Sequence, residues 1–159
     1  MGSAEVVATL TERRLTIAVA ESLTGGLLVA ELIKTPGASA VVRGGIVAYD
    51  TALKHSLLGV DAGLLAVHGP VHADVARQMA AGVRAALTVD DLPADIGIAT
   101  TGVAGPEPQG GVAVGTVFVA IALGIDIHVI ELSLNGDREA IRSAVVSESL
   151  LELERLLAL

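Results

Sequence analysis

Two turns rich in small hydroxyl residues and glycine stand where apolar runs end, and they are the first candidates for chemistry. The first is AVAESLTGG, residues 18–26, and the second is ATTGVAGP, residues 99–106. When a buried strand ends in such residues and a helix follows, backbone N–H groups and hydroxyls converge where no bulky side chain blocks a ligand. Two such turns in one small chain predict that an anionic ligand is held between them.

Seven residues of these turns are candidates for lining a ligand crevice: Ser22, Thr24, Gly25, Gly26, Thr101, Gly102 and Gly105. Taken singly, each hydroxyl can equally serve as a helix cap and each glycine as a simple turn, because Ser and Thr are ordinary N-cap residues. Neither turn is a known phosphate fingerprint, since TGG is shorter than GxGxxG and TGVAGP lacks the GK[ST] of a P-loop. Hydrolysis of a nucleoside triphosphate is therefore not expected.

A serine and a lysine between the two turns offer nucleophilic chemistry. Ser39 closes the segment GAS, and Lys54 lies five positions after Tyr49. A serine hydroxyl needs a base to act as a nucleophile, and a desolvated lysine can be that base. Arg138 and Arg142 are four residues apart on one helix face and could pair with an anionic substrate. Taken singly, each of these cations can equally be a solvated surface charge.

Metal and paired-carboxylate chemistry find no support in the sequence. His68 and His72 are four residues apart, but Gly69-Pro70 between them breaks the helix that would place both on one face. The chain has no cysteine, which excludes disulfides, thiolate chemistry and Cys-ligated zinc. Glu21 is the only acid beside a candidate turn. We therefore expect no metal.

Charge and aromatic content exclude several classes of partner. A formal net charge of −8 opposes binding to nucleic acid or to an anionic membrane. Tyr49 and Phe118 are the only aromatic residues, too few for the stacking platforms of single-stranded nucleic-acid binders. The sequence shows no signal-peptide pattern, and Gly, Pro or charge breaks every apolar run well short of about 18 residues. We expect a cytoplasmic protein that binds neither nucleic acid nor membrane.

The apolar pattern alternates between helical and extended segments, which must position these side chains. The periodicity predicts helices over 4–13, 24–34, 51–59, 61–67, 71–87 and 137–157. It predicts strands over 16–21, 44–49, 94–100, 114–123 and 125–134, with the last two pairing as an antiparallel edge. This order predicts one α/β domain over residues 1–159, a three-layer α/β/α sandwich with a largely parallel sheet. Ligands collect beyond the carboxyl ends of such strands, where the two turns should meet.

Several ordered blocks resemble the C-terminal domain of the competence and damage-inducible CinA proteins, the nicotinamide-nucleotide amidohydrolase family. The blocks are AESLTGGLL, GAS, GGIVAYDTALKHSLLGV, HGPVHADVARQMAAG, TTGVAGP, GGVAVGTVFVA and NGDREAIR, and they cover nearly the whole chain. The resemblance implies an α/β/α fold with a mixed, mostly parallel five-stranded sheet. It also implies hydrolysis of the carboxamide of nicotinamide mononucleotide (NMN) to nicotinate mononucleotide and ammonia, in pyridine-nucleotide salvage, with no metal or organic cofactor.

The resemblance further implies which residues act. The positions that match the family's active-site motifs are Ser22 in AES, Ser39 in GxS, Tyr49 and Lys54 in YxxxxK, Thr101 in TGVAGP and Arg138 in GDR. On this basis we expect Ser39 to be the nucleophile and Lys54 its base. Ser22 would hold the proton network, and Tyr49 would lie against the pyridinium ring. Substrate-binding residues are expected to be Thr24, Gly25, Thr101, Gly102, Gly105, Arg138 and Arg142, with Arg138 pairing with the phosphate.

Some features of the sequence depart from the family pattern and leave alternatives open. Leu23 and Ala38 stand where hydroxyl residues or cysteine are common, and Asp50 with Thr51 alters the charge near Lys54. A non-catalytic nucleotide-binding or assembly module, or an amidase for another phosphorylated amide, would fit the same residues. Family members are often fused to an N-terminal molybdopterin-binding-like domain, so the chain is either a stand-alone enzyme or an excised half. Its small size and aliphatic composition favour a homo-oligomer.

Overall fold

The computed structural model describes residues 2–159 and is built on one five-stranded sheet. The strands are β1 (Ile17–Glu21), β2 (Val42–Val47), β3 (Ile96–Gly102), β4 (Thr116–Leu123) and β5 (Asp126–Ser133). They lie in the order β2-β1-β3-β4-β5. β1 pairs in parallel with β2 and β3, whereas β4 pairs antiparallel with both β3 and β5. The mixed, mostly parallel sheet and its antiparallel edge are therefore confirmed.

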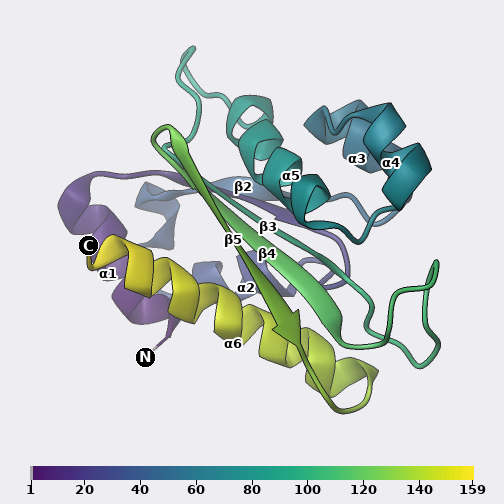
Figure 1. Ribbon diagram of the computed structural model, residues 1–159. Coiled ribbons are helices and arrows are strands. Elements are labelled where there is room, and N and C mark those ends of the chain that lie inside the picture. Colours follow the sequence, from purple (N-terminus) through teal and green to yellow (C-terminus); the bar gives the residue numbers. More distant parts are fainter. Residues whose placement is uncertain (1) are drawn as a thin grey trace.

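Helices cover both faces of the sheet. They are α1 (Ser3–Arg13), α2 (Leu27–Ile33), α3 (Thr51–Leu58), α4 (Ala62–His68), α5 (Ala73–Ala86) and α6 (Arg138–Leu157), with a short 3-10 turn, η1 (Ala38–Ala40). Helices α1, α2 and α6 lie on one face and α3, α4 and α5 on the other (Figure 1). The three-layer sandwich is thus confirmed. None of the helices in the described residues is long and apolar enough to cross a membrane.

The two faces of the sheet are packed with different side chains. The face under α1, α2 and α6 is filled mainly by large aliphatic residues such as Leu28, Ile98 and Leu153. The face under α5 is rich in alanine, including Ala18, Ala99 and Ala120 on the strands themselves. Small side chains let a helix approach a sheet closely, so α5 lies against the centre of the sheet with no room for a Cβ on Gly97 beside Ala80 O.

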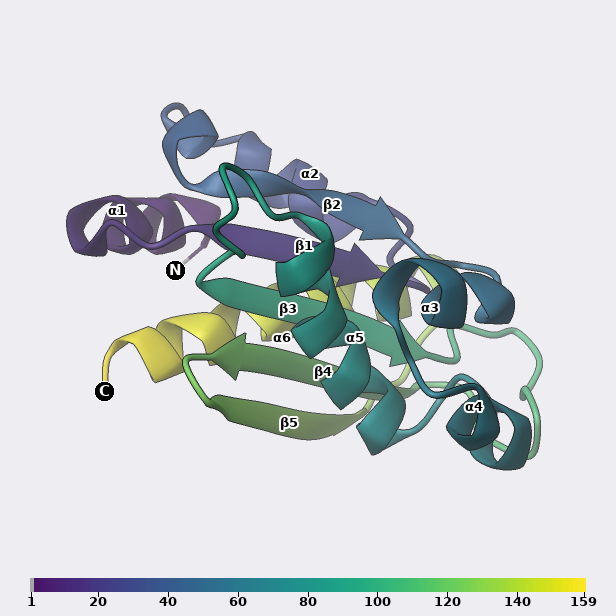
Figure 2. The same ribbon diagram turned by 90° about the horizontal axis from the view of Figure 1, so that it is seen from above.

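The chain order around β1 creates the place where a ligand can bind. From β1 the chain runs through α2 to β2 on one side, and then returns through α3, α4 and α5 to β3 on the other side. The segments that leave β1 and β3 therefore diverge at the carboxyl ends of these strands, which is the topological switch point of an open parallel sheet. Figure 2 shows β1, β2 and β3 pointing toward the same edge of the molecule, the edge where α3 lies.

Most helix boundaries follow the sequence prediction, and the differences have local causes. Asp50 and Asp137 cap α3 and α6, because their carboxylates accept from the backbone N–H of Ala52 and Ala140. Helix α2 begins at Leu27 rather than near residue 24, because Gly25 and Gly26 adopt φ values of +59° and +106° that no helix contains. The residues between β1 and α2 are therefore a true turn, free to present side chains to a ligand.

Candidate active site

Ser22 and Lys54 lie in contact at the carboxyl ends of β1 and β2. Ser22 follows the last residue of β1, and its backbone N–H donates to Thr100 O at 3.1 Å, which fixes the turn against β3. Lys54 lies on the first turn of α3, directly after β2. Its Nζ lies 2.8 Å from Ser22 Oγ and 2.7 Å from Ala48 O. The two polar partners hold the amine beside the serine oxygen.

The surroundings of Lys54 favour a neutral amine. Its side chain is 1% exposed, and burial lowers its pKa from 10.5 to about 8, while the nearby Asp50 charge acts in the opposite direction. With such a pKa, about a tenth of the molecules carry a neutral Lys54 at pH 7. The ammonium donates to Ser22 Oγ, whereas in the neutral form the Ser22 hydroxyl can donate to the amine lone pair. This is the arrangement that a Ser-Lys nucleophile requires.

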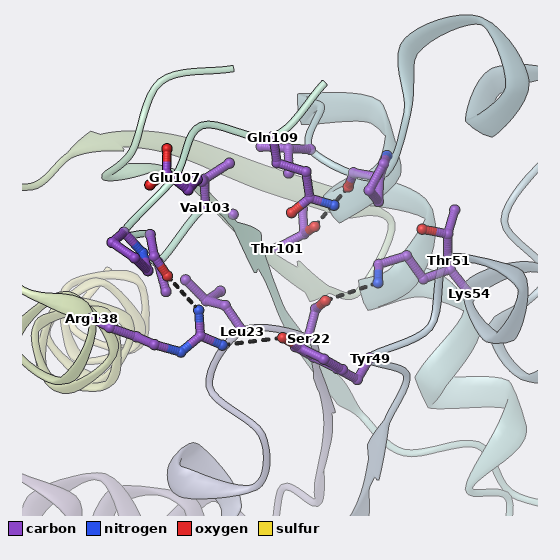
Figure 3. A pocket seen from close by; sticks show the side chains of 16 residues that line it. Ser22, Leu23, Tyr49, Thr51, Lys54, Thr101, Val103, Glu107, Gln109 and Arg138 are labelled. Atoms are coloured by element: carbon purple, nitrogen blue, oxygen red, sulfur yellow. Dashed lines mark hydrogen bonds between the residues drawn. The ribbon is translucent and has the colours of Figure 1, made fainter. Parts of the chain in front are cut away.

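A pocket of about 260 Å³ opens directly onto this pair. It is lined by Ser22, Leu23, Tyr49, Thr51, Lys54, Pro70, Val71, Thr101, Gly102, Val103, Ala104, Gly105, Pro106, Glu107, Gln109 and Arg138 (Figure 3). These residues come from the turn after β1, the start of α3, the α4–α5 turn, the loop after β3 and the start of α6. The expectation that the two small-residue turns meet at one crevice is therefore confirmed.

Arg138 forms one wall of the pocket, away from Lys54 (Figure 3). Its Nη1 donates to Gly105 O at 2.6 Å, and its Nη2 donates to Tyr49 OH at 3.1 Å. The Tyr49 side chain is otherwise open to solvent, with the residue 61% exposed. The guanidinium thus links α6, the loop after β3 and the residues after β2. It also places a permanent positive charge on the pocket wall.

Thr101 lines the pocket, but its hydroxyl proton is already used in a hydrogen bond within the protein. Thr101 Oγ1 donates to Pro70 O at 2.6 Å and so ties the end of β3 to the α4–α5 turn. Gly102 and Gly105 also lie in the lining, as expected from the sequence. The Thr101 oxygen keeps its lone pairs for accepting a hydrogen bond from a ligand.

Thr24, Gly25, Gly26 and Arg142 lie outside this pocket lining, in contrast to the expectation that they line the crevice or contact substrate. Thr24 Oγ1 is 2.8 Å from Thr100 Oγ1 in a buried contact. Arg142 donates through Nε to Leu23 O at 2.8 Å and through Nη2 to Thr24 O at 3.3 Å. These groups brace the Ser22 turn from behind, because they satisfy its hydroxyl and carbonyl groups within the protein.

Ser39 lies at the other end of β2, and the expectation that it pairs with Lys54 is wrong. Ser39 is an exposed residue of η1, which precedes β2, whereas Lys54 follows β2. It lines a separate depression that includes Pro36 and Arg43 but not Lys54. Figure 2 shows the blue turn before β2 and helix α3 at opposite ends of this strand. The structure therefore brings Ser22, not Ser39, to the lysine.

Glu21 has a structural role that its position in the motif does not reveal. Its carboxylate is fully buried and accepts from Leu28 N at 2.8 Å and Val29 N at 3.0 Å. A carboxylate at the amino end of a helix is stabilised by the unpaired N–H groups there. Glu21 therefore anchors α2 to β1 and does not line the pocket.

The sequence interpretation missed several pocket residues. Thr51, Pro70, Val71, Val103, Ala104, Pro106, Glu107 and Gln109 all line the pocket without having been assigned to it. Pro70 and Val71 lie in the HGPVH block and the others near recognised motifs, but no periodic pattern says which of their side chains face a cavity. Within residues 2–159, no three His, Asp or Glu side chains converge as metal ligands. That the chain needs no metal stays a prediction.

Comparisons with known proteins agree with this architecture. The family model for the CinA C-terminal domain matches residues 2–157. A CinA-like protein of Frankia casuarinae is 48% identical over 153 residues, which are 96% of this chain and 34% of that protein. A putative competence-damage inducible protein of Geobacillus kaustophilus is 49% identical over 134 residues, 84% of this chain and 31% of that protein. The chain thus spans about a third of the length of these relatives.

A solved structure of a CinA superfamily protein has the same fold as this chain. The crystal structure of a CinA superfamily protein from Klebsiella pneumoniae superimposes with a TM-score of 0.92 at 32% sequence identity. The match covers 98% of this chain and 95% of that one. The arrangement of strands and helices that builds the pocket is therefore shared along nearly the whole length of both chains.

Proposed function

The chain belongs to the CinA C-terminal domain family, and on this basis we propose that it is a nicotinamide-nucleotide amidohydrolase. The reaction is hydrolysis of the carboxamide of NMN to nicotinate mononucleotide and ammonia. One observation carries the proposal: the buried Lys54 amine, with a pKa of about 8, lies 2.8 Å from Ser22 Oγ in an open pocket. A serine with such a base is suited to attack an amide carbonyl.

In the first half of the reaction, neutral Lys54 takes the hydroxyl proton of Ser22 while Ser22 Oγ forms a bond to the amide carbon. The carbonyl oxygen gains negative charge in this step and needs a hydrogen-bond donor. The Leu23 N–H is suited to be that donor, because Leu23 follows the nucleophile and lines the pocket. Its N–H donates to no acceptor within residues 2–159, so it is free for the substrate.

In the second half, the Lys54 ammonium returns its proton to the amide nitrogen as the C–N bond breaks and ammonia leaves. The acyl group is then an ester on Ser22. Lys54 takes a proton from water as the water oxygen attacks this ester, and the proton passes to Ser22 Oγ as the acyl bond breaks. One water is consumed, one ammonia is released, and both side chains return to their starting state.

The pocket walls offer groups suited to bind the remainder of an NMN molecule. Arg138 offers a guanidinium for the phosphate, since two of its five N–H groups are used within the protein and the others remain for a ligand. Tyr49, held by Arg138, places an aromatic side chain at the same wall, where it can contact the cationic pyridinium. The substrate would then extend from Arg138 to Ser22.

The test is release of ammonia from NMN by the purified chain, with nicotinate mononucleotide identified by chromatography. We expect release by the native chain and none by Lys54→Ala, which removes the base. Nicotinamide riboside, which lacks the phosphate, should be a poorer substrate. A native chain that binds NMN without releasing ammonia would instead be a non-catalytic nucleotide-binding module. Faster release from a different phosphorylated amide would change the assigned substrate.

A further inference from the structure

Gln109 lies on a short hairpin that holds its backbone in place beside the pocket. Its N–H donates to Val112 O at 3.1 Å, and Val112 N–H donates back to Gln109 O at 2.9 Å. The two residues between them, Gly110 and Gly111, have φ values of +55° and +79°, as a two-residue hairpin turn requires. The backbone of Gln109 is therefore held in one position, although the loop is exposed.

The carboxamide of Gln109 points into the pocket and is free. Figure 3 shows it directed toward Thr101, at the end of the pocket that holds Lys54 and away from Arg138. The hydrogen bond drawn beside it joins Thr101 Oγ1 to Pro70 O. Among the pocket residues drawn, the Gln109 amide has no hydrogen-bond partner. It therefore offers one acceptor oxygen and two N–H donors to a ligand.

The position of Gln109 indicates which part of the proposed substrate it can contact. Under the proposed function, Arg138 meets the phosphate, and the reacting carboxamide meets Ser22 and Lys54 at the other end. Gln109 faces this second end, so the substrate group within its reach is the carboxamide and not the phosphate. A primary amide has N–H groups that a glutamine oxygen accepts, while its carbonyl oxygen stays with Leu23 N–H.

We propose that Gln109 is a positioning residue that accepts a hydrogen bond from the carboxamide nitrogen of the substrate through Oε1. This inference rests on the proposed function. The contact fixes rotation of the amide about its bond to the ring, so that the carbonyl carbon faces Ser22 Oγ and the nitrogen faces Lys54. Small errors in such alignment are costly in rate, by up to about a hundredfold for a displacement of about 1 Å.

The test compares two variants of the same residue with NMN as substrate. Gln109→Leu keeps a side chain of similar volume and removes its polar atoms, and we expect kcat/KM to fall by about tenfold to a hundredfold. Its thermal stability should equal that of the native chain, because the lost amide bonds nothing in the protein. Val112→Thr, across the same turn, is the matched control and should keep kcat/KM within about twofold.

Gln109→Glu gives a second readout that a merely structural role would not move. Glutamate keeps an acceptor for the amide N–H but adds a negative charge at the Lys54 end, which raises the pKa of Lys54. The acidic limb of the pH profile of kcat/KM should therefore move to higher pH. In Gln109→Leu the same limb should not move. Native kcat/KM in Gln109→Leu, or an unmoved limb in Gln109→Glu, would overturn this role alone. Absence of ammonia release by the native chain would overturn the proposed function as well.

Discussion

Two serines in glycine-containing turns lie at opposite ends of the parallel strands, and only one of them lies beside a lysine amine. Ser22 follows β1, is nearly buried, and lies 2.8 Å from a lysine amine. Ser39 precedes β2, is exposed, and lines a depression whose charged member is Arg43. Both belong to sequence blocks on which the resemblance to one family rests. The environment at the two ends of the strands, and not the residue type, separates a candidate nucleophile from a surface serine.

The direction of the strands explains this difference. Lys54 lies on α3, the helix that follows β2, so it shares the carboxyl edge of the sheet with the residues that follow the neighbouring parallel strands. Ser39 comes before the same strand, which has six residues and is about 20 Å long. A strand of this length separates Ser39 from Lys54 although they are close in sequence. Ser22 is distant in sequence but follows the neighbouring strand.

Among substitutions of the residues around Ser22, we expect the largest loss of activity from Lys54→Met, which removes the proposed base. We expect the rate of ammonia release from NMN to fall by about a thousandfold or more, because general-base activation of the nucleophile is lost. A rate within tenfold of native would show that Lys54 is not the base. The measurement is kcat by continuous ammonia detection.

The same variant should be more stable than the native chain near neutral pH. Burial of the Lys54 ammonium costs roughly 3 kcal/mol, from the lowering of its pKa from 10.5 to about 8. Loss of the hydrogen bonds to Ser22 Oγ and Ala48 O offsets about 1 to 2 kcal/mol of this, so the free energy of unfolding should rise by about 1 to 2 kcal/mol at pH 7.

This gain in stability should depend on pH with a defined sign. Between pH 8 and 10.5 the unfolded chain holds a proton on Lys54 that the folded chain has released, so the native protein becomes more stable as the pH rises. The advantage of Lys54→Met should therefore disappear across this interval. Urea unfolding at pH 7 and pH 10 measures it, and an equal difference at both values would contradict the assignment of a lowered pKa.

Two arginines on α6 give the next contrast, since one lines the pocket and the other braces the turn behind it. Arg138→Gln should lower kcat/KM for NMN by about tenfold to a hundredfold, because a charged contact to the phosphate is lost, and should change nicotinamide riboside far less. Arg142→Gln should mainly destabilise the fold, by about 1 to 2 kcal/mol, because Leu23 O and Thr24 O lose their donor. The same loss of activity toward both substrates in Arg138→Gln would exclude a phosphate contact.

A smaller effect is expected from Asp50→Asn, which removes the negative charge that opposes the lowering of the Lys54 pKa. Asparagine is as good an N-cap as aspartate, so α3 should keep its start. The pKa of Lys54 should fall further, and the acidic limb of the kcat/KM profile should move to lower pH. Activity near pH 6.5 would then rise about twofold. A move of this limb to higher pH would contradict the stated charge effect.

The sequence was sufficient to predict the fold and the place of the candidate site, and insufficient to predict which serine lies beside Lys54. Hydrophobic periodicity is local, so it predicts strands and helices such as β4, β5 and α6. The meeting of residues 22 and 101 follows from the rule for parallel strand ends. The same rule applied to Ser39 would have excluded it, because it lies before its strand. The orientations of Glu21 and Gln109 depend on turn geometry and packing, which no periodic pattern contains.

The most direct test of Ser22 as the nucleophile is a comparison of Ser22→Ala with Ser39→Ala in ammonia release from NMN. Both substitutions remove one hydroxyl from a glycine-containing turn, so they are matched in chemistry. The structure predicts that Ser22→Ala loses about ten thousandfold or more in kcat, while Ser39→Ala stays within about twofold of the native chain. Full activity in Ser22→Ala together with loss of activity in Ser39→Ala would contradict the assignment of the Ser22–Lys54 pair.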